Sequence, residues 1–569
     1  MLLILLSWIY IFFTTLNFGI LLKKVFGIQK CNPIIHHFLG LLLYTLLCSL
    51  AAFFIRLNIE FYLFVFIINV FIVFKFRNLT RFHFNSFVKT FFNLKTSYRF
   101  LFILILIIVL AQSSTKPFLL DNESYYIQTI KWINEYGYVK GLVNLHPFFG
   151  QNSSWHTLQA GFNFSFICPI FNDINGYLFI LASLLYLEKL NNYETSKSIQ
   201  NFYLGLTLIF SIFLMQFINA PSPDLIIFLV TPYILFLFLE KRYTISINDF
   251  KIILSLVLFL CFVKVTMAIL IVLSIILFVQ NFKTLKGSLA SYIAISSTML
   301  ILFLCKNAII SGYLFYPIEL FDFLNFEWKQ PKALLNFYKR GTYLDGMNNV
   351  DTSHLNFFET FKYWLTIPKL DGLFNSFYIL LLILFPWFLL KKNKASGLFI
   401  IYTLSILQLI LLWNNSPQYR FFFAFIMFLS VQIFISVFKN KMIGFYLVCI
   451  AIVASAFSVF FNINLKHFTD NALAMDSNSF SIKHIIVPAG ISKTTTKFTK
   501  ETINGFEFYS PNSDMFIWGT GNGNLPCVNK KQVNYIKTYY HYTPVLRTKN
   551  QKDGFLSVPT ENEIIKTNF

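Results

Sequence analysis

The sequence predicts an all-α polytopic membrane protein that carries a small mixed or β-rich domain at its C-terminus. Of the 569 residues, 56% are hydrophobic and only 12% are charged, and the mean hydropathy is +0.63. Soluble domains carry about 25% charged residues. The apolar residues also gather in separate runs, many of which approach the length that crosses a bilayer of about 30 Å. These observations exclude a soluble, disordered or coiled-coil protein.

Fourteen apolar segments follow one another along the chain, and they predict about 12 to 14 transmembrane helices. Several have only about 14 to 16 residues, so flanking aromatic residues would have to extend them. The stretch 251–281 is interpreted as two helices that separate at Lys264, because one long helix would break the alternation of the loops. The segments lie near residues 2–22, 37–55, 60–75, 99–112, 176–190, 201–218, 225–239, 251–264, 267–281, 288–305, 375–390, 396–413, 421–438 and 442–461.

The net charge of +21 is interpreted through its distribution, because the basic residues of membrane proteins collect in cytoplasmic loops. With the first helix running inwards, the cytoplasmic loops hold 21 Lys and Arg residues, against 13 in the longer outer loops that precede residue 462. This bias predicts that the active face, the N-terminus and the C-terminus lie outside the cytoplasm, which for a bacterial inner membrane is the periplasmic side. Nucleic acid, the usual partner of a soluble protein with such a charge, is not expected.

The same orientation divides the chain into a transmembrane domain, 1–461, and an extracytoplasmic domain, 462–569. Two long polar loops of the first domain, 113–175 and 306–374, fall on the outer side as well. The final segment alternates β-prone runs with turn residues, which predicts strands. Those runs begin at His484, Phe506, Met515 and Pro544. No two of the seven cysteines have the CxxC spacing. We therefore expect neither a zinc site nor a disulfide framework.

The first outer loop places two carboxylates where the chain leaves the membrane. From Asn122 the sequence predicts an amphipathic helix that ends at Gly137. Asp121 either caps this helix or acts as a general base at the membrane surface. Glu123 is expected to assist it or to bind a divalent ion. Two carboxylates at this spacing do not define a metal site, so no metal ligand is assigned and a divalent cofactor stays an open alternative.

Further along this loop, residues 144–156 have the composition typical of a sugar-binding site, rich in aromatic and hydrogen-bonding side chains. Aromatic faces cover the C–H patches of a sugar, while amides and imidazoles hydrogen-bond to its hydroxyl groups. We therefore expect substrate binding by His146, Asn152, Trp155 and His156. The alternative is a loop whose Trp155 is anchored among lipid headgroups.

Four more polar residues are expected on the outer face, and each has a structural alternative. Asp224 follows a proline-stiffened turn, where it would otherwise cap the next helix. Lys264 interrupts an apolar stretch, where it would otherwise reach for the membrane surface. Tyr316 would otherwise belong to an interfacial aromatic belt. Arg420 needs an anionic neighbour, and its forked donors suit a phosphate, although a lipid headgroup would also satisfy it.

Together these groups predict an inverting membrane glycosyltransferase that takes a sugar from a polyprenyl-phosphate donor. Cations would stabilise the departing phosphate, while Asp121 deprotonates the attacking group of a glycan, lipid or protein acceptor. One alternative is a polymerase or ligase of lipid-linked glycans. Another is a transporter or flippase of such glycans, which would hold its ionisable residues near the bilayer midplane. A third is a membrane scaffold for the C-terminal domain.

The pattern resembles the GT-C class of multi-pass membrane glycosyltransferases, and more closely a group of uncharacterised multi-pass membrane proteins from Bacteroidetes-type bacteria. The resemblance covers roughly residues 100 to 425 and implies that Asp121 is the catalytic acidic residue of the first outer loop. The sequence departs from the double-acidic form of that motif, because Asn122 separates Asp121 from Glu123. The elements that carry the resemblance are Asp121 to Trp155, Ser222-Pro223-Asp224, Lys264, Gly312-Tyr313 to Tyr316-Pro317, and Pro417 to Arg420-Phe421.

Overall fold

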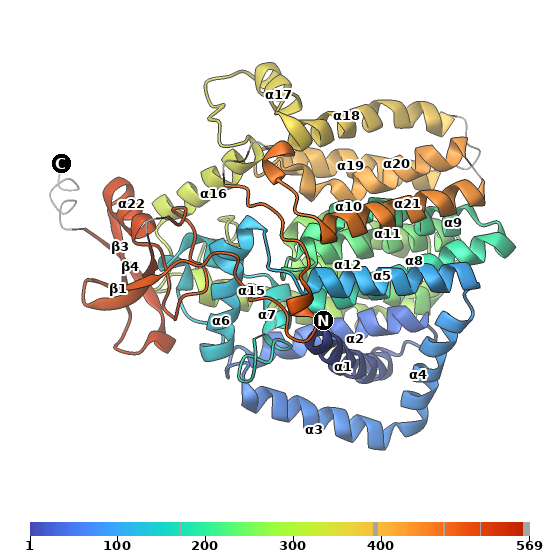
Figure 1. Cartoon of the computed structure of the whole chain (residues 1–569), viewed down its shortest axis with the longest axis horizontal. Coiled ribbons are helices and arrows are strands. Elements are labelled where there is room, and N and C mark those ends of the chain that lie inside the picture. The colour runs from blue at the N-terminus through green and yellow to red at the C-terminus, as the bar shows by residue number, and fades with distance from the viewer. Residues whose placement is uncertain are drawn as a thin grey trace.

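Long helices dominate the computed structural model, which describes residues 1–169, 173–390, 396–438, 440–469, 471, 473–512 and 514–560. Most of these helices run side by side in one bundle (Figure 1). The elements of the bundle are α1 (Leu2–Phe26), α2 (Pro33–Ala51), α3 (Ile59–Lys75), α4 (Arg77–Phe92), α5 (Thr96–Ser113), α8 (Ile174–Ser196), α9 (Ile199–Leu206), α10 (Ser211–Leu214), α11 (Asp224–Lys241), α12 (Ile247–Val263), α13 (Ile271–Gln280), α14 (Phe282–Leu285), α15 (Leu289–Ser311), α18 (Lys369–Leu390), α19 (Ser396–Trp413), α20 (Phe423–Val437) and α21 (Lys441–Phe460).

Each of the fourteen predicted apolar segments is helical, but fewer of them than predicted meet the length and composition of a membrane span. Within the described residues, eight helices are long and apolar enough to cross a membrane, or nine if α3 and α4 count as one bent span. The eight are Leu2–Phe26, Pro33–Ala51, Thr96–Ser113, Ile199–Phe217, Phe282–Ser311, Lys369–Leu390, Ser396–Trp413 and Lys441–Phe460. Others are shorter, like α20, or carry charged residues at their ends, like α11.

A break in the helix at Lys264 agrees with the interpretation of 251–281 as two helices. α12 ends at Val263, and Lys264 has an extended backbone with φ −149°. The chain then continues through a 3₁₀ turn, Val265–Leu270, into α13. Because the turn reverses the chain, α12 and α13 pack against each other, and Lys264 lies at one end of the bundle.

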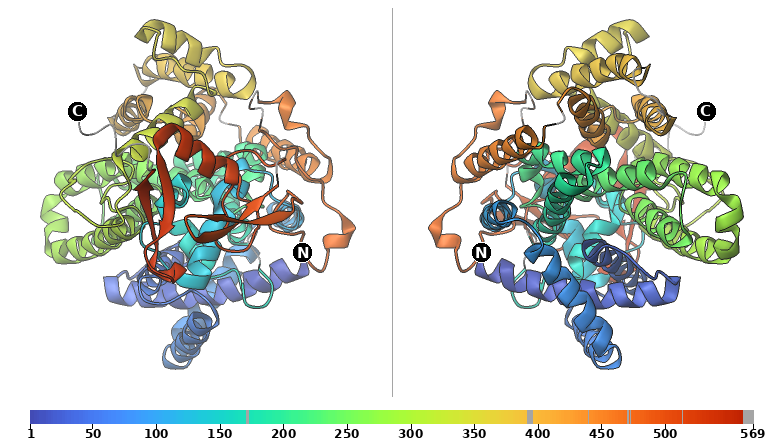
Figure 2. Two further views of the ribbon diagram at one scale, coloured as in Figure 1. Left: turned by 90° about the vertical axis from the view of Figure 1, so that its left-hand side faces the viewer. Right: turned by 90° about the vertical axis from the view of Figure 1, so that its right-hand side faces the viewer.

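The segments predicted to lie on the outer side gather at one end of the bundle (Figure 1). α6 and α7 belong to the first outer loop, and α16 and α17 to the second. Viewed from that end, the C-terminal strands lie over the middle of the bundle, next to the first outer loop (Figure 2, left). The elements are α6 (Ile127–Tyr136), α7 (Ser154–Ala160), α16 (Lys332–Gly346), α17 (Phe357–Leu365), α22 (Lys530–Tyr540), β1 (Phe498–Ile503), β2 (Phe506–Pro511), β3 (Tyr542–Leu546) and β4 (Phe555–Pro559).

The C-terminal region is mixed, with two antiparallel two-stranded sheets, β1–β2 and β3–β4, and the helix α22. The strands predicted from Phe506 and Pro544 are present as β2 and within β3. Those predicted from His484 and Met515 are wrong, because both stretches form turns. Their backbone groups bond to other segments instead. Ile485 O, for example, accepts a hydrogen bond from Leu2 N, so a tertiary contact takes the place of a strand partner.

Candidate functional site

Asp121 stands where the chain turns from α5 into the first outer loop. A π-helical turn, Asn122–Tyr126, follows it and leads into α6, which ends at Gly137 with φ +77°. The predicted end of this helix is therefore confirmed. Asp121 precedes the turn, but its side chain caps no backbone N–H. Its carboxylate accepts a hydrogen bond from Arg420 instead, so the capping interpretation is wrong. π-helical turns are often found at functional sites.

Arg420 approaches Asp121 from a distant part of the chain. It lies in a short turn, Tyr419–Phe421, between α19 and α20. Its Nη1 atom lies 2.9 Å from Asp121 Oδ2 and 3.8 Å from Asp224 Oδ2. A guanidinium that is largely removed from water needs such anionic partners, because an unpaired buried charge is strongly unfavourable.

Asp224 and Lys264 complete the set, which we call the charge cluster: Asp121, Asp224, Lys264 and Arg420. Asp224 is the first residue of α11, and Pro223 occupies the position that the capping interpretation gave to Asp224. The Asp224 carboxylate forms an ion pair with the Lys264 ammonium. Lys264 Nζ also lies 4.1 Å from the centre of the Phe421 ring. Four residues from four loops thus meet at one place, with two positive and two negative charges.

A cavity of about 420 Å³ opens beside the charge cluster, and its mixed apolar and polar wall includes Asp121 and Arg420. We call it the polar cavity because of these charged groups. The end of α16 and the segment that follows α21 close its other sides. Of the charge cluster, Asp121 and Arg420 keep 27% and 29% of their side-chain surface exposed, whereas Asp224 keeps 4%. A molecule in the cavity therefore reaches the Asp121–Arg420 pair before it reaches Asp224.

Asp345, at the end of α16, is a further carboxylate in this cavity, and sequence reasoning missed it. Burial raises its pKa to about 6, and Asp121 adds to that shift, whereas Arg420 opposes it. Among the described residues, Asp345 has no hydrogen-bond or ion-pair partner. The neighbouring aspartates Asp322 and Asp351 pair with Lys329 and Arg340. In the sequence, nothing distinguishes these three aspartates of one polar loop.

Glu123 lies apart from Asp121 and holds the C-terminal region in place. Its side chain is fully buried, and its carboxylate accepts hydrogen bonds from Ser492 Oγ at 2.7 Å, Thr494 Oγ1 at 2.9 Å and Lys493 N at 2.9 Å. It does not line the cavity. In the part of the chain that the structure describes, no three His, Cys, Asp or Glu side chains are arranged to hold a metal ion.

The predicted sugar-binding residues of the first outer loop are buried in its interior. Trp155 is fully enclosed, and its Nε1 donates to Asn175 Oδ1 at 2.7 Å, so it is not anchored among headgroups. Burial lowers the pKa of both His146 and His156 to about 3. The Asn152 carbonyl accepts a hydrogen bond from Lys306 Nζ at 2.6 Å. None of the four lines the polar cavity.

Tyr316 is also buried, between the first outer loop and α16. Its hydroxyl donates to the Pro147 carbonyl at 3.3 Å, and its ring centre lies 5.3 Å from that of Tyr338. The sequence signal for these residues was the density of aromatic and polar groups. Such groups bury against one another when a long loop folds into a compact layer, so composition alone does not separate a binding surface from loop packing.

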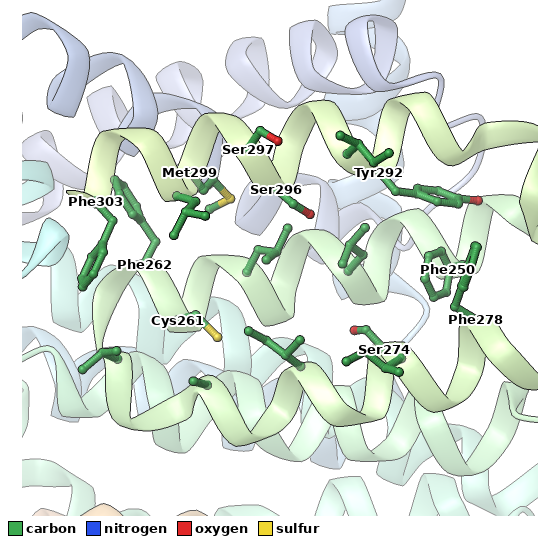
Figure 3. A pocket seen from close by; sticks show the side chains of 18 of the residues that line it. Phe250, Cys261, Phe262, Ser274, Phe278, Tyr292, Ser296, Ser297, Met299 and Phe303 are labelled. Carbon is green, nitrogen blue, oxygen red and sulfur yellow. The ribbon is translucent and has the colours of Figure 1, made fainter. Parts of the chain in front are cut away.

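An apolar groove of about 600 Å³ runs between α12, α13 and α15 (Figure 3). Phe250, Phe278 and Tyr292 lie at one end of it, and Phe262 and Phe303 at the other. Between them the lining residues are apolar or small. Val265, the residue after Lys264 in the sequence, also lines the groove, whereas none of the four residues of the charge cluster does.

Comparison with known proteins identifies a family. The model of a family described as a domain of unknown function (DUF8201) matches residues 1–427. The matched stretch contains all four residues of the charge cluster and ends before the C-terminal region. No curated protein and no solved structure matches the chain.

Proposed function

The chain belongs to the DUF8201 family, a domain of unknown function, and we propose that it is a glycosyltransferase of the bacterial inner membrane. In this proposal it transfers a sugar from a polyprenyl-phosphate donor to a glycan, lipid or protein acceptor outside the cytoplasm. The observation that carries the proposal is the meeting of Asp121, Asp224, Lys264 and Arg420 beside a polar cavity at one end of an apolar helical bundle. The resemblance to the GT-C class agrees with it by analogy.

The two cations of the charge cluster suit the phosphate of the donor. Arg420 offers forked donors that match two phosphate oxygens, and it is the cation that faces the cavity. Lys264 lies one residue from the apolar groove. When the bond between the sugar and the phosphate breaks, negative charge grows on the phosphate, and cations already fixed in place stabilise it without reorganisation.

The apolar groove suits the isoprenoid chain of the donor. Its wall on α15 extends from Leu289 to Phe303, which is about 21 Å at 1.5 Å per residue. A chain in this groove would present its phosphate near Lys264, because Val265 and Phe262 line the end of the groove next to that residue. The polar head and the apolar tail of one molecule would then each meet a surface of its own kind.

The proposed reaction is a single displacement. A hydroxyl oxygen of the acceptor forms a bond to the anomeric carbon, the bond from that carbon to the phosphate oxygen breaks, and the electron pair leaves with the phosphate. A carboxylate of the cavity takes the proton of the hydroxyl group. Attack from the side opposite the leaving group inverts the anomeric centre.

We also propose that more than eight helices cross the membrane, to a total of about 12 to 14. α8, α11, α12 and α20 run alongside the eight candidate spans in the bundle (Figure 1). α11 is almost wholly buried by its neighbours, so its charged ends matter less than they would in contact with lipid. A flippase is less well supported, because the charge cluster lies at one end of the bundle rather than in its middle.

Binding of the carrier tests this proposal directly. The purified protein in lipid nanodiscs is expected to bind undecaprenyl phosphate more tightly than undecaprenol, which lacks only the phosphate. Arg420→Ala should remove most of that preference, whereas Arg340→Ala, on the exposed surface, should leave it unchanged. Transfer is then measured with undecaprenyl-phosphate-linked sugars. Equal binding of the two lipids, together with no transfer from any donor, would overturn the proposal.

A further inference from the structure

Asp345 stands in the polar cavity with a carboxylate that no other residue of the described ranges binds. It is the last residue but one of α16 and is exposed to the cavity. No hydrogen bond or ion pair joins it to any residue in the described ranges. The charged groups that share the cavity with it are Asp121, Asp371 and Arg420, and the ionisable rings near it are Tyr338 and Tyr419. A carboxylate in this position is free to accept a proton or a hydrogen bond from a ligand.

Asp121, by contrast, is already engaged. Its Oδ2 atom accepts hydrogen bonds from Arg420 Nη1 at 2.9 Å and from the Tyr126 hydroxyl at 3.4 Å. A proton on Asp121 would cancel the charge that holds Arg420 in place, at the moment when Arg420 has to stabilise the departing phosphate. The geometry therefore suits Asp121 to orienting Arg420, and the proton has to go to another group.

The face of α16 that leads to Asp345 is open. Phe337, Gly341 and Asp345 are spaced four residues apart, so they follow one another along one side of the helix. A Cβ atom added at Gly341 would meet no atom within 4 Å. The middle of this face thus presents bare backbone with free space above it. At its outer part, the Phe337 ring lies 5.4 Å from Trp518 and 4.9 Å from Tyr540, measured between ring centres.

We propose that α16 forms the acceptor side of the cavity, with a sugar hydroxyl of a glycan acceptor delivered over Gly341 to Asp345, which takes its proton. This inference rests on the proposed transferase function and assigns the acceptor half of the site. The partly exposed rings around Phe337 cover the C–H faces of the acceptor sugars, and the space above Gly341 admits the sugar that reacts. Arg420 and Lys264 hold the donor phosphate on the other side.

The atoms balance in one step. The O–H bond of the acceptor breaks as its oxygen bonds to the anomeric carbon of the donor sugar, and the proton passes to the carboxylate of Asp345. The bond between the anomeric carbon and the phosphate oxygen breaks, and that oxygen keeps the electron pair. No oxidant, reductant or third reactant takes part.

Substitution of Asp345 tests the catalytic part. Asp345→Asn is expected to lower the turnover rate by about 100- to 10,000-fold, the usual contribution of a general base, while undecaprenyl phosphate binds as before. Asp345→Glu should restore a measurable rate. Asp351→Asn is the matched control, since it changes an exposed aspartate of the same loop. Full turnover by Asp345→Asn would overturn the inference even if the protein transfers sugar, and no transfer by the wild type would overturn the transferase function as well.

Substitution of Gly341 tests the path of the acceptor. Gly341→Trp fills the open space and is expected to raise the KM for a glycan acceptor at least tenfold, with carrier binding and thermal stability unchanged. Gly287→Trp is the matched control and should keep wild-type kinetics, because Gly287 also has no atom within 4 Å of its Cβ position but lines neither the cavity nor the groove. An unchanged acceptor KM in Gly341→Trp would overturn the assignment of this face.

Discussion

Arg420 Nη1 lies 2.9 Å from Asp121 Oδ2, although 299 residues separate the two in the chain. The pair joins the first outer loop to the turn before α20, on the wall of the polar cavity. About a quarter of each side chain remains exposed, so a ligand can reach the pair. A cation held by a carboxylate at the edge of a cavity is positioned in advance for an anionic ligand.

Asp121→Asn is expected to reduce sugar transfer at least tenfold with little loss of stability. The ion pair is partly exposed, and such pairs contribute about 1 kcal/mol or less, while Asp224 still faces Arg420 at 3.8 Å. The rate falls because Arg420 loses the partner that orients it. Transfer assays and thermal unfolding measure the two effects. Wild-type transfer by this variant would remove Asp121 from the mechanism.

The Asp224–Lys264 pair is expected to behave as one unit. Lys264→Met leaves the buried Asp224 with Arg420, 3.8 Å away, as a weaker partner. Breaking a buried ion pair lowers the free energy of unfolding by about 3 kcal/mol. The double variant Asp224→Asn/Lys264→Met should regain most of that stability, because it leaves no uncompensated charge, but not the transfer activity. Thermal unfolding of the wild type, Lys264→Met, Asp224→Asn and the double variant forms the double-mutant cycle. Additive effects of the two substitutions would show that the residues do not interact.

Transfer is expected to depend on pH through Asp345. Burial raises its pKa to about 6, and a general base works only when ionised, so kcat/KM should rise with pH below about 6 and level off above it. Asp345→Asn should lose this rise. Because the folded state binds this proton more tightly than the unfolded state does, the group stabilises the fold only at low pH. The variant should therefore keep its Tm at pH 7, and an unchanged pH profile would assign the rise to another group.

Glu123→Gln is expected to loosen the C-terminal region. The substitution weakens the acceptor for three buried donors, on Ser492, Lys493 and Thr494, and an imperfectly satisfied buried network costs about 1 to 3 kcal/mol. Limited proteolysis should then cut near residue 495 faster than in the wild type. Glu507→Gln changes an exposed residue paired with Lys500 and is the control. Equal proteolysis of the two variants would show that Glu123 does not hold this region.

The orientation in the membrane is a separate prediction. A reporter enzyme fused after residue 462 should be active outside the cytoplasm, because the basic residues are concentrated in the loops of the opposite side. A second fusion within the basic segment between α3 and α5 should report the cytoplasm. The reverse pattern would place the polar cavity on the cytoplasmic face and contradict the proposed periplasmic reaction.

Hydropathy was sufficient to locate the helices of the apolar segments, all fourteen of which are helical. The break at Lys264 and the end of α6 before Gly137 also fall where the sequence predicts them. These features depend on neighbouring residues alone: apolar runs favour helices, and glycine adopts a positive φ without strain. The strands at His484 and Met515 failed as predictions because a strand needs a partner, and the chain supplies other contacts at those places.

The four residues of the charge cluster were predicted to belong to one outer-face site, but sequence alone did not establish how they pair. Ionisable groups beside apolar segments stand out, since each is unfavourable unless something compensates it. The pairing of these acids and bases depends on the packing of α11, α12, α20 and the first outer loop against one another. The local sequence does not specify that packing. The same reason explains why the sequence did not show the surroundings of Glu123, which lies only two residues from Asp121 but accepts hydrogen bonds from the C-terminal region.

The sequence by itself determined a chain of apolar helices with polar loops, because the hydrophobic effect and backbone geometry act on short stretches. Only the tertiary structure decided that Asp121 meets Arg420, that Asp345 has no partner among the residues the structure describes, and that Trp155 and His156 are buried. Burial and pairing are properties of a neighbourhood built from distant segments. Residues of one kind, such as the aspartates of the second outer loop, therefore acquire different surroundings only when the chain folds.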